Sequence, residues 1–197
     1  LKRYLSVDHP TRIALYQGTL QPNRSLDVLI RAAKYVAPDS IIVMMGEGES
    51  RAALEALIRQ EHAGDRVKII PAVPYEELLA WTTSADIGLN VLSPDFSPSI
   101  RLTLPNKLFE YMMAGVPVLT SQLDAVVELV TTYRVGCVVR SLDPHDVADA
   151  INGMLADRDG LAQMRQNALA ACQTEFNWER ESAKLLTLYY DVLEATA

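Results

Sequence analysis

Short apolar runs alternate with amphipathic segments through most of the chain, and this alternation constrains the fold more than any other feature. The runs at 12–17 and 41–45 are apolar at almost every successive position, which predicts strands buried on both faces. Between such runs, apolar residues recur three and four positions apart, as on one face of a helix. The expected strands are 12–17, 41–45, 66–70, 85–92, 116–120 and 135–139, and the expected helices are 25–36, 51–61, 75–82, 105–114, 143–156, 159–175 and 178–194, with a polar loop at 93–102.

Strands of this kind, each followed by a helix, specify a parallel sheet covered on both faces. Because such crossovers are right-handed, we expect one α/β domain over 1–197, a Rossmann-like, doubly wound parallel sheet of about six strands. Open parallel sheets bind ligands at the carboxyl ends of their strands. The loops of interest are therefore 18–25, 46–50, 71–75, 93–107 and 120–124.

Charge and composition exclude several classes of function. The chain has 18 basic and 25 acidic residues and a net charge of −7, which argues against a nucleic-acid surface. Cys137 and Cys172 form no CxxC pair and are interpreted as small core residues. No apolar run approaches the roughly 20 residues of a membrane span. No metal site is predicted, because the three histidines lack ligand spacing: His9, His62 and His145.

The loop after the first expected strand contains a candidate phosphate site. Gly18 would let a ligand approach the backbone closely. Ser25 is a candidate N-cap of the following helix, and Arg24 would add positive charge at that helix start. The alternative is an ordinary turn with a surface arginine, since the spacing is not that of a GxGxxG motif. Gly46 and Gly48 close the second strand, where they predict either a close approach to a ligand or a plain turn.

The most informative segment is 104–118, with the sequence LPNKLFEYMMAGVPV. Pro105 suits a first helical turn. Asn106 and Lys107 would then lie beside the exposed N–H groups at the positive helix end, with Glu110 one turn further in. This arrangement suits a nucleoside diphosphate, with phosphates at the helix start and a carboxylate for the two ribose hydroxyls. The alternative is a solvated Lys107–Glu110 pair, worth a few tenths of a kcal/mol.

Taken in order, these segments resemble the C-terminal, donor-binding domain of the GT-B glycosyltransferases, especially the group 1 family. The resemblance runs from about Arg12 to the C-terminus. The segments that carry it are Gly18-Thr19-Leu20 with Arg24-Ser25, Gly46-Glu47-Gly48, 67–73 with 85–89, and the block 105–118.

The resemblance implies a role for particular residues. Glu110 should hold the ribose hydroxyls, Arg24 and Lys107 should neutralise the diphosphate, and the base should lie near residues 72 and 73. The complete set expected to bind a nucleotide sugar is Gly18, Thr19, Arg24, Gly46, Gly48, Ala72, Val73, Asn106, Lys107, Leu108 and Glu110. No catalytic residue is assigned.

The resemblance also implies an enzyme that transfers a sugar from a uridine, guanosine or adenosine diphosphate donor without a cofactor or metal ion, with retention at the anomeric carbon. A missing N-terminal domain should bring a carbohydrate or lipid-linked acceptor, and the helix at 178–194 should pack toward that domain. Alone, this chain should bind nucleotide weakly and transfer little. Polysaccharide biosynthesis in the cytoplasm, with or without contact at the inner membrane face, is the expected setting.

Two residues depart from the family pattern and leave the donor sugar and the stereochemistry open. Leu102 occupies the position of a frequent second glutamate, whose role would fall to Asp95, Ser97 or Ser99, and Thr19 replaces a frequent arginine. The alternatives are a GT-B-type UDP-sugar epimerase or a phosphorylase, a non-catalytic nucleotide-sensing module, and a plain flavodoxin-like domain.

Overall fold

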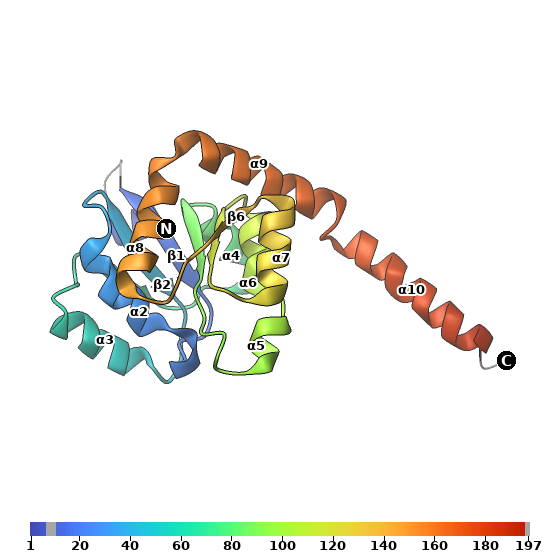
Figure 1. Cartoon of the computed structure of the whole chain (residues 1–197), viewed down its shortest axis with the longest axis horizontal. Helices are drawn as coiled ribbons and strands as arrows, with labels where there is room; N and C mark the ends of the chain where they lie inside the picture. The colour runs from blue at the N-terminus through green and yellow to red at the C-terminus, as the bar shows by residue number, and fades with distance from the viewer. Residues whose placement is uncertain (7–10, 196–197) are drawn as a thin grey trace.

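The protein was analysed as a computed structural model, which describes residues 1–6 and 11–195 and shows a central sheet between two layers of helices (Figure 1). The strands are β1 (Arg12–Gln17), β2 (Ser40–Met45), β3 (Val67–Ile70), β4 (Ile87–Asn90), β5 (Val118–Thr120) and β6 (Gly136–Val138). The helices are α1 (Lys2–Leu5), α2 (Leu26–Ala32), α3 (Arg51–Gln60), α4 (Tyr75–Thr82), α5 (Pro98–Leu102), α6 (Asn106–Met113), α7 (Asp124–Tyr133), α8 (Pro144–Ala156), α9 (Arg158–Thr174) and α10 (Trp178–Ala195).

The sheet has the order β3-β2-β1-β4-β5-β6, and every neighbouring pair is parallel. This confirms the predicted doubly wound α/β fold. The winding direction reverses at β1, which pairs with β2 on one side and β4 on the other. The carboxyl ends of β1 and β4 therefore flank the crevice where folds of this kind bind ligands.

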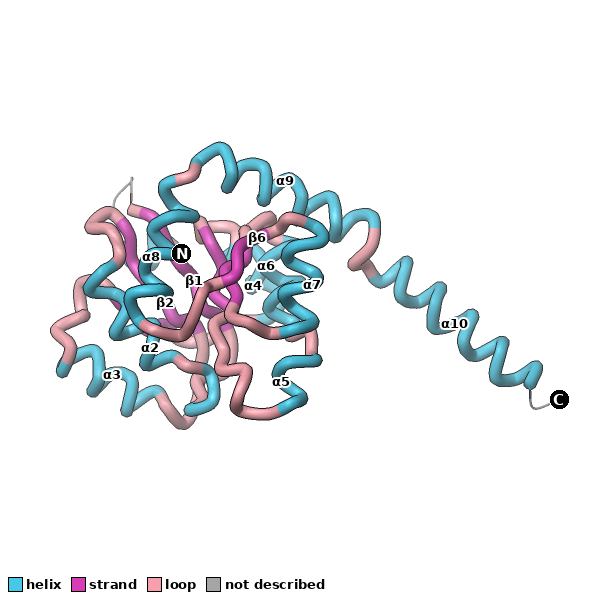
Figure 2. The backbone as a smooth tube through the Cα atoms, in the orientation of Figure 1, coloured by secondary structure: helices cyan, strands magenta, loops and turns pink. Residues whose placement is uncertain are grey.

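Each face of the sheet has its own apolar core, and the alternation of side chains along the strands assigns residues to the two faces. On one face, α2, α3 and α8 pack on residues such as Ala14 and Ile42. On the other face, α6, α7 and the second half of α9 pack on residues such as Leu15 and Val43. The central strands are buried on both sides (Figure 2), as their apolar sequences predict.

Two differences from the sequence-based expectations lie just before α6. The expected loop at 93–102 contains the short helix α5, whose N-cap Ser97 accepts a hydrogen bond on its hydroxyl from the Ile100 N–H at 3.3 Å. Pro105 precedes α6 instead of lying in its first turn, and its backbone is extended with φ −75° and ψ 145°. Proline fixes only φ, so it is compatible with either position.

The expected helix at 25–36 is shorter, because α2 ends at Ala32 and a 3-10 turn follows at Ala33–Tyr35. Ser25 occupies the N-cap position, but its side chain makes no capping hydrogen bond. Its φ of 51° is left-handed, whereas a capping serine has an extended backbone that aims its hydroxyl at the helix N–H groups.

Several strands are also shorter than the apolar runs that predict them. β4 ends at Asn90, although the apolar residues 91 and 92 follow it. Leu92 instead donates its N–H to the Ser121 hydroxyl at 2.9 Å and accepts that hydroxyl on its carbonyl at 2.5 Å. The apolar pattern therefore predicts which residues are buried. The strand itself ends where the backbone hydrogen bonds go to a side chain and no longer to the backbone of the neighbouring strand.

The last helix, α10, extends away from the rest of the protein (Figure 1). Most of its apolar side chains are exposed, including Leu188 and Tyr189 at 59% and 61%. An amphipathic helix normally buries its apolar face, so this face is available to a surface outside the described residues. No helix among those described is long and apolar enough to cross a bilayer.

Candidate functional site

The residues predicted from the loop 18–25 and from the helix at 105–114 meet at the carboxyl end of β1. Gly18 follows β1 directly and has a φ of +128°, a conformation that side chains rarely adopt. A Cβ at this position would lie 3.3 Å from the Lys107 Nζ atom of α6. The absence of a side chain at Gly18 therefore leaves room for the lysine.

Lys107 is the most perturbed cation at this site. Its Nζ atom lies 3.8 Å from the centroid of the Tyr16 ring, in a cation–π contact. The residue as a whole is partly exposed, but its ammonium group is enclosed. Burial, and to a smaller extent the charge of Arg24, lowers the pKa of Lys107 from 10.5 to about 7, while Glu110 opposes this shift. Bringing an anion to Lys107 would offset both unfavourable effects.

Tyr16 forms the floor beneath the lysine. Its ring is fully buried, and its hydroxyl donates a hydrogen bond to the Thr19 carbonyl at 2.8 Å. Burial raises the pKa of Tyr16 to about 12, although Arg24 acts in the opposite direction. Tyr16 is therefore neutral at physiological pH and supplies a ring face and a brace for the loop that follows β1.

Arg24 lies at the end of a 3-10 turn, Pro22–Arg24, in the same loop. Within 1–6 and 11–195, its guanidinium takes part in no recorded hydrogen bond or ion pair, and its charge acts on Lys107 and Tyr16. Lys107 lies at the start of α6, whose N–H groups also attract anions. Together with the charge of Arg24, which acts on Lys107, this helix start forms a site suited to phosphate.

Glu110 is the carboxylate of this site. It is half-buried, and its Oε2 atom accepts a hydrogen bond from the Gln17 side chain at 2.6 Å. No ion pair within 4 Å joins Lys107 and Glu110 in the described structure. The alternative of a solvated lysine–glutamate pair is therefore wrong for this structure.

The two glycines after β2 have a structural reason that the sequence did not reveal. A Cβ at Gly46 would lie 1.9 Å from the Gly18 carbonyl oxygen, and one at Gly48 would lie 2.2 Å from the Leu20 carbonyl oxygen. The two loops also share backbone hydrogen bonds, such as Leu20 N–H to the Glu47 carbonyl at 2.9 Å. These glycines let the loops pack on each other, and ligand contact by them stays a prediction.

The other predicted residues occupy different surroundings. Thr19 and Asn106 are exposed at the site, and Ala72 is exposed in the segment between β3 and α4 beside the partly buried Val73. Leu108 is fully buried and its N–H donates to the Pro105 carbonyl at 2.9 Å, so ligand contact by this residue stays a prediction. It packs in the core because it lies on the inner face of α6.

The sequence-based reasoning missed three residues that support the site. Gln17 touches Glu110, Thr82 of α4 touches Gln17, and the Tyr111 hydroxyl accepts the Gln17 N–H at 3.0 Å. The available signal was Gln17 itself, a polar residue that ends an otherwise apolar strand after Ile13.

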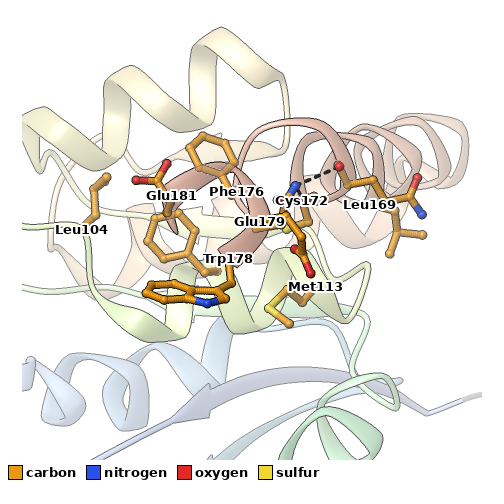
Figure 3. A pocket seen from close by; sticks show the side chains of 11 residues that line it. Leu104, Met113, Leu169, Cys172, Phe176, Trp178, Glu179 and Glu181 are labelled. Carbon is orange, nitrogen blue, oxygen red and sulfur yellow. Dashed lines mark hydrogen bonds between the residues drawn. The ribbon is translucent and has the colours of Figure 1, made fainter. Parts of the chain in front are cut away.

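A large apolar pocket of the described structure lies elsewhere. It has a volume of about 1140 Å³ and is mainly apolar (Figure 3). It lies between α6, α9 and the start of α10, and side chains such as Phe109, Phe176 and Trp178 line it. None of the predicted binding residues lines it. This pocket is continuous with the exposed face of α10 and lacks the cations that a diphosphate needs.

No cluster of three or more His, Cys, Asp or Glu side chains with metal-binding geometry occurs in the described part of the chain. His9 lies outside the described residues. His62 lies in the turn after α3, whereas His145 lies in α8 and stacks on Tyr35 with ring centroids 3.6 Å apart.

The fold is that of an α/β enzyme domain, and a family model places the chain among enzymes with this fold. The model described as "Glycosyl transferases group 1" matches residues 2–170. The chain belongs to the group 1 glycosyltransferases, which confirms the resemblance inferred from the sequence.

Individual relatives show how much of such an enzyme this chain covers. A D-inositol 3-phosphate glycosyltransferase of Xylanimonas cellulosilytica is 29% identical over 189 residues, which are 94% of this chain and 43% of that protein. The chain therefore spans less than half the length of this curated relative.

Solved structures show the same relation. A sucrose-phosphate synthase of Thermosynechococcus elongatus superimposes with a TM-score of 0.82 at 24% identity, over 98% of this chain and 48% of that one. Anabaena HepE in complex with UDP-glucose superimposes with a TM-score of 0.80 at 19% identity, over 94% and 51%. A match to about half of each enzyme is what one half of a two-domain GT-B fold gives.

Proposed function

We propose that this chain is the donor-binding half of a glycosyltransferase that uses a nucleoside diphosphate sugar. The observation that carries the proposal is the pair of cations, Lys107 at the start of α6 and Arg24 in the loop after β1, with the Glu110 carboxylate one turn further along α6. The solved structure of HepE contains UDP-glucose, which is a ligand of this chemical class.

In this proposal the diphosphate binds between Arg24, Lys107 and the first N–H groups of α6. Glu110 accepts hydrogen bonds from the ribose hydroxyls, each worth about 1.5–3 kcal/mol because the acceptor is charged. The base lies against the exposed segment at Ala72 and Val73. As the sugar leaves, negative charge grows on the diphosphate, and fixed cations stabilise that charge without a metal ion.

The acceptor site belongs to the other half of the enzyme in this proposal, and the exposed face of α10 packs against that half. Transfer would proceed with retention, to a carbohydrate or lipid-linked acceptor in polysaccharide biosynthesis. These points rest on the family and on the exposure of Leu188 and Tyr189.

Calorimetric titration of UDP, GDP and ADP into the chain, with EDTA present, tests the proposal. One nucleotide should bind, and Glu110→Ala should weaken it at least tenfold, or about 1.4 kcal/mol. Pyrophosphate should bind the variant as it binds the wild type, because it has no ribose. The matched control is Glu194→Ala, an exposed carboxylate near the far end of α10 (Figure 1).

A result in which Glu110→Ala and Glu194→Ala bind the nucleotide equally would contradict the ribose assignment. Binding that requires Mg²⁺ would contradict the proposed metal independence. For the full-length enzyme, the anomeric configuration of the product distinguishes retention from inversion.

A further inference from the structure

Gln17 is the only polar residue between Ile13 and the end of β1, and it is almost fully buried, at 2% exposure. Its side chain reaches across the crevice from β1 to α6, where its Nε2 atom donates to Glu110 Oε2 at 2.6 Å. Burial of an amide is costly unless its polar atoms are hydrogen-bonded. The hydrogen bond to Glu110 therefore offsets part of the cost of burying the Gln17 amide.

The partners of Gln17 fix which way its amide points. A carboxylate can only accept, so the amide nitrogen must face Glu110. The amide oxygen then faces the Thr82 hydroxyl at 2.8 Å, and this hydroxyl shares its single proton between the amide oxygen and the Leu78 carbonyl, which lies 2.7 Å away. Thr82 is fully buried on α4, so this second contact is also shielded from water. Glu110 of α6 and Thr82 of α4 thus hold the two ends of the Gln17 amide.

The backbone of Gln17 is held as firmly as its side chain. Its N–H donates to the Tyr111 hydroxyl at 3.0 Å, and that hydroxyl donates to the Leu15 carbonyl at 2.9 Å. Tyr111 is buried on α6, one residue after Glu110. The strand end and the helix are consequently joined at two adjacent points, which limits movement of Glu110 relative to β1.

We propose that Gln17, oriented by Thr82, is a positioning residue that holds one oxygen of Glu110 and leaves the other for the ribose hydroxyls. This inference rests on the proposed function. An amide suits this role because it adds no charge to the site. Its N–H also forms a stronger hydrogen bond with a charged acceptor than with a neutral one. A bound carboxylate also loses less rotamer freedom when the ribose binds.

The experiment is performed on the whole chain and compares a ribonucleoside diphosphate with its 2′,3′-dideoxy analogue. The probe is UDP, or GDP or ADP if the titrations above select that base. The ratio of the two dissociation constants isolates the contribution of the ribose hydroxyls. In the wild type we expect the ribonucleotide to bind at least tenfold more tightly.

Gln17→Met keeps the length of the side chain but removes both hydrogen bonds, and it should reduce this ratio at least threefold. Thr82→Val keeps the shape of threonine but removes the donor to Gln17, and it should reduce the ratio in the same direction. The matched control is Gln163→Met, at an exposed position of α9, which should leave the ratio unchanged. Thermal unfolding of each variant reports whether the fold is retained.

Gln17→Glu provides a readout that a merely structural role would not move. It places two carboxyl groups in contact, so one of them holds a proton to higher pH. At pH 5.5 a shared proton restores the hydrogen bond, and the ratio should lie within threefold of the wild-type ratio. At pH 8 repulsion should displace Glu110 and reduce the ratio at least tenfold.

The outcomes separate the two proposals. If Glu110→Ala keeps the wild-type ratio, the proposed ribose contact is wrong. A different result is that Glu110→Ala reduces the ratio of dissociation constants to about one while the variants of Gln17 and Thr82 keep the wild-type ratio at pH 8. That result would overturn the positioning role. If the Gln17 variants do not fold, Thr82→Val decides: a reduced ratio supports the inference and an unchanged ratio refutes it.

Discussion

Binding of a nucleoside diphosphate should draw a proton from solution, and Lys107 is the group that takes it up. In the free protein, burial and the charge of Arg24 hold the pKa of Lys107 at about 7. At pH 8 about nine-tenths of the lysine side chains are then neutral. A diphosphate beside the lysine favours its charged form, so binding at this pH should take up about 0.9 proton per nucleotide.

The same pKa sets the pH dependence of the affinity. Between pH 7 and pH 9 the protonated fraction of a group with a pKa near 7 falls about 50-fold. If the bound lysine stays charged throughout, the dissociation constant should rise by this factor. The other groups near the lysine do not mask the effect, because the pKa of Tyr16 is about 12 and arginine stays charged.

Calorimetry at pH 8 measures the proton directly. The observed enthalpy is compared in HEPES and in Tris, which differ in their enthalpy of ionisation and contain no phosphate to compete for the site, and the slope gives the number of protons taken up. A nucleotide sugar is the better ligand, since it has no terminal phosphate that titrates near pH 6. Lys107→Arg serves as the control, because its charge is permanent and should abolish the uptake.

The reasoning would be refuted by either of two results. The first is an uptake below about 0.3 proton in the wild type, which would place the pKa of Lys107 well above 8 or leave it unchanged on binding. The second is the same uptake in Lys107→Arg, which would assign the proton to another group.

Other substitutions test the packing around the site, with unfolding by denaturant as the measurement in each case. For Lys107 the folded pKa lies below the unfolded value of 10.5, so its destabilisation is absent above pH 10.5, grows as pH falls toward 7 and is complete below that. Lys107→Met should therefore raise the free energy of unfolding at pH 6, by at most about 5 kcal/mol. Gly88→Ala should lower it by about 1–3 kcal/mol, because the new Cβ would lie 2.5 Å from the Tyr111 ring; no change would show that the ring can move aside. Tyr111→Phe should lower it by about 1–3 kcal/mol, since the buried Gln17 N–H loses its acceptor, and an unaltered value would indicate a substitute partner. Removal of 182–197 should change it by less than about 0.5 kcal/mol, because the side chains at 182–194 are mostly exposed; a larger loss would mean that α10 stabilises the sheet.

The sequence by itself determined the layered fold and predicted where the candidate site lies along the chain. Runs such as 41–45, apolar at successive positions, require burial on both faces, and that requirement is met by a parallel sheet with helices on each side. The helix that carries Lys107 and Glu110 was predictable because its apolar residues recur three and four positions apart. Local periodicity was less informative about ends, so α5 was missed and Pro105 was misplaced by one position.

Only the tertiary structure decided how the site residues act on one another. Gln17 meets Glu110 across 93 positions of sequence and Thr82 across 65, and these contacts depend on which strands are neighbours. The pKa of Lys107 depends first on the burial of its ammonium group and then on the charges of Arg24 and Glu110. Gly46 and Gly48 are required by a neighbouring loop. Side-chain periodicity encodes which face is buried, whereas desolvation, orientation and close approach arise from residues that only the fold brings together.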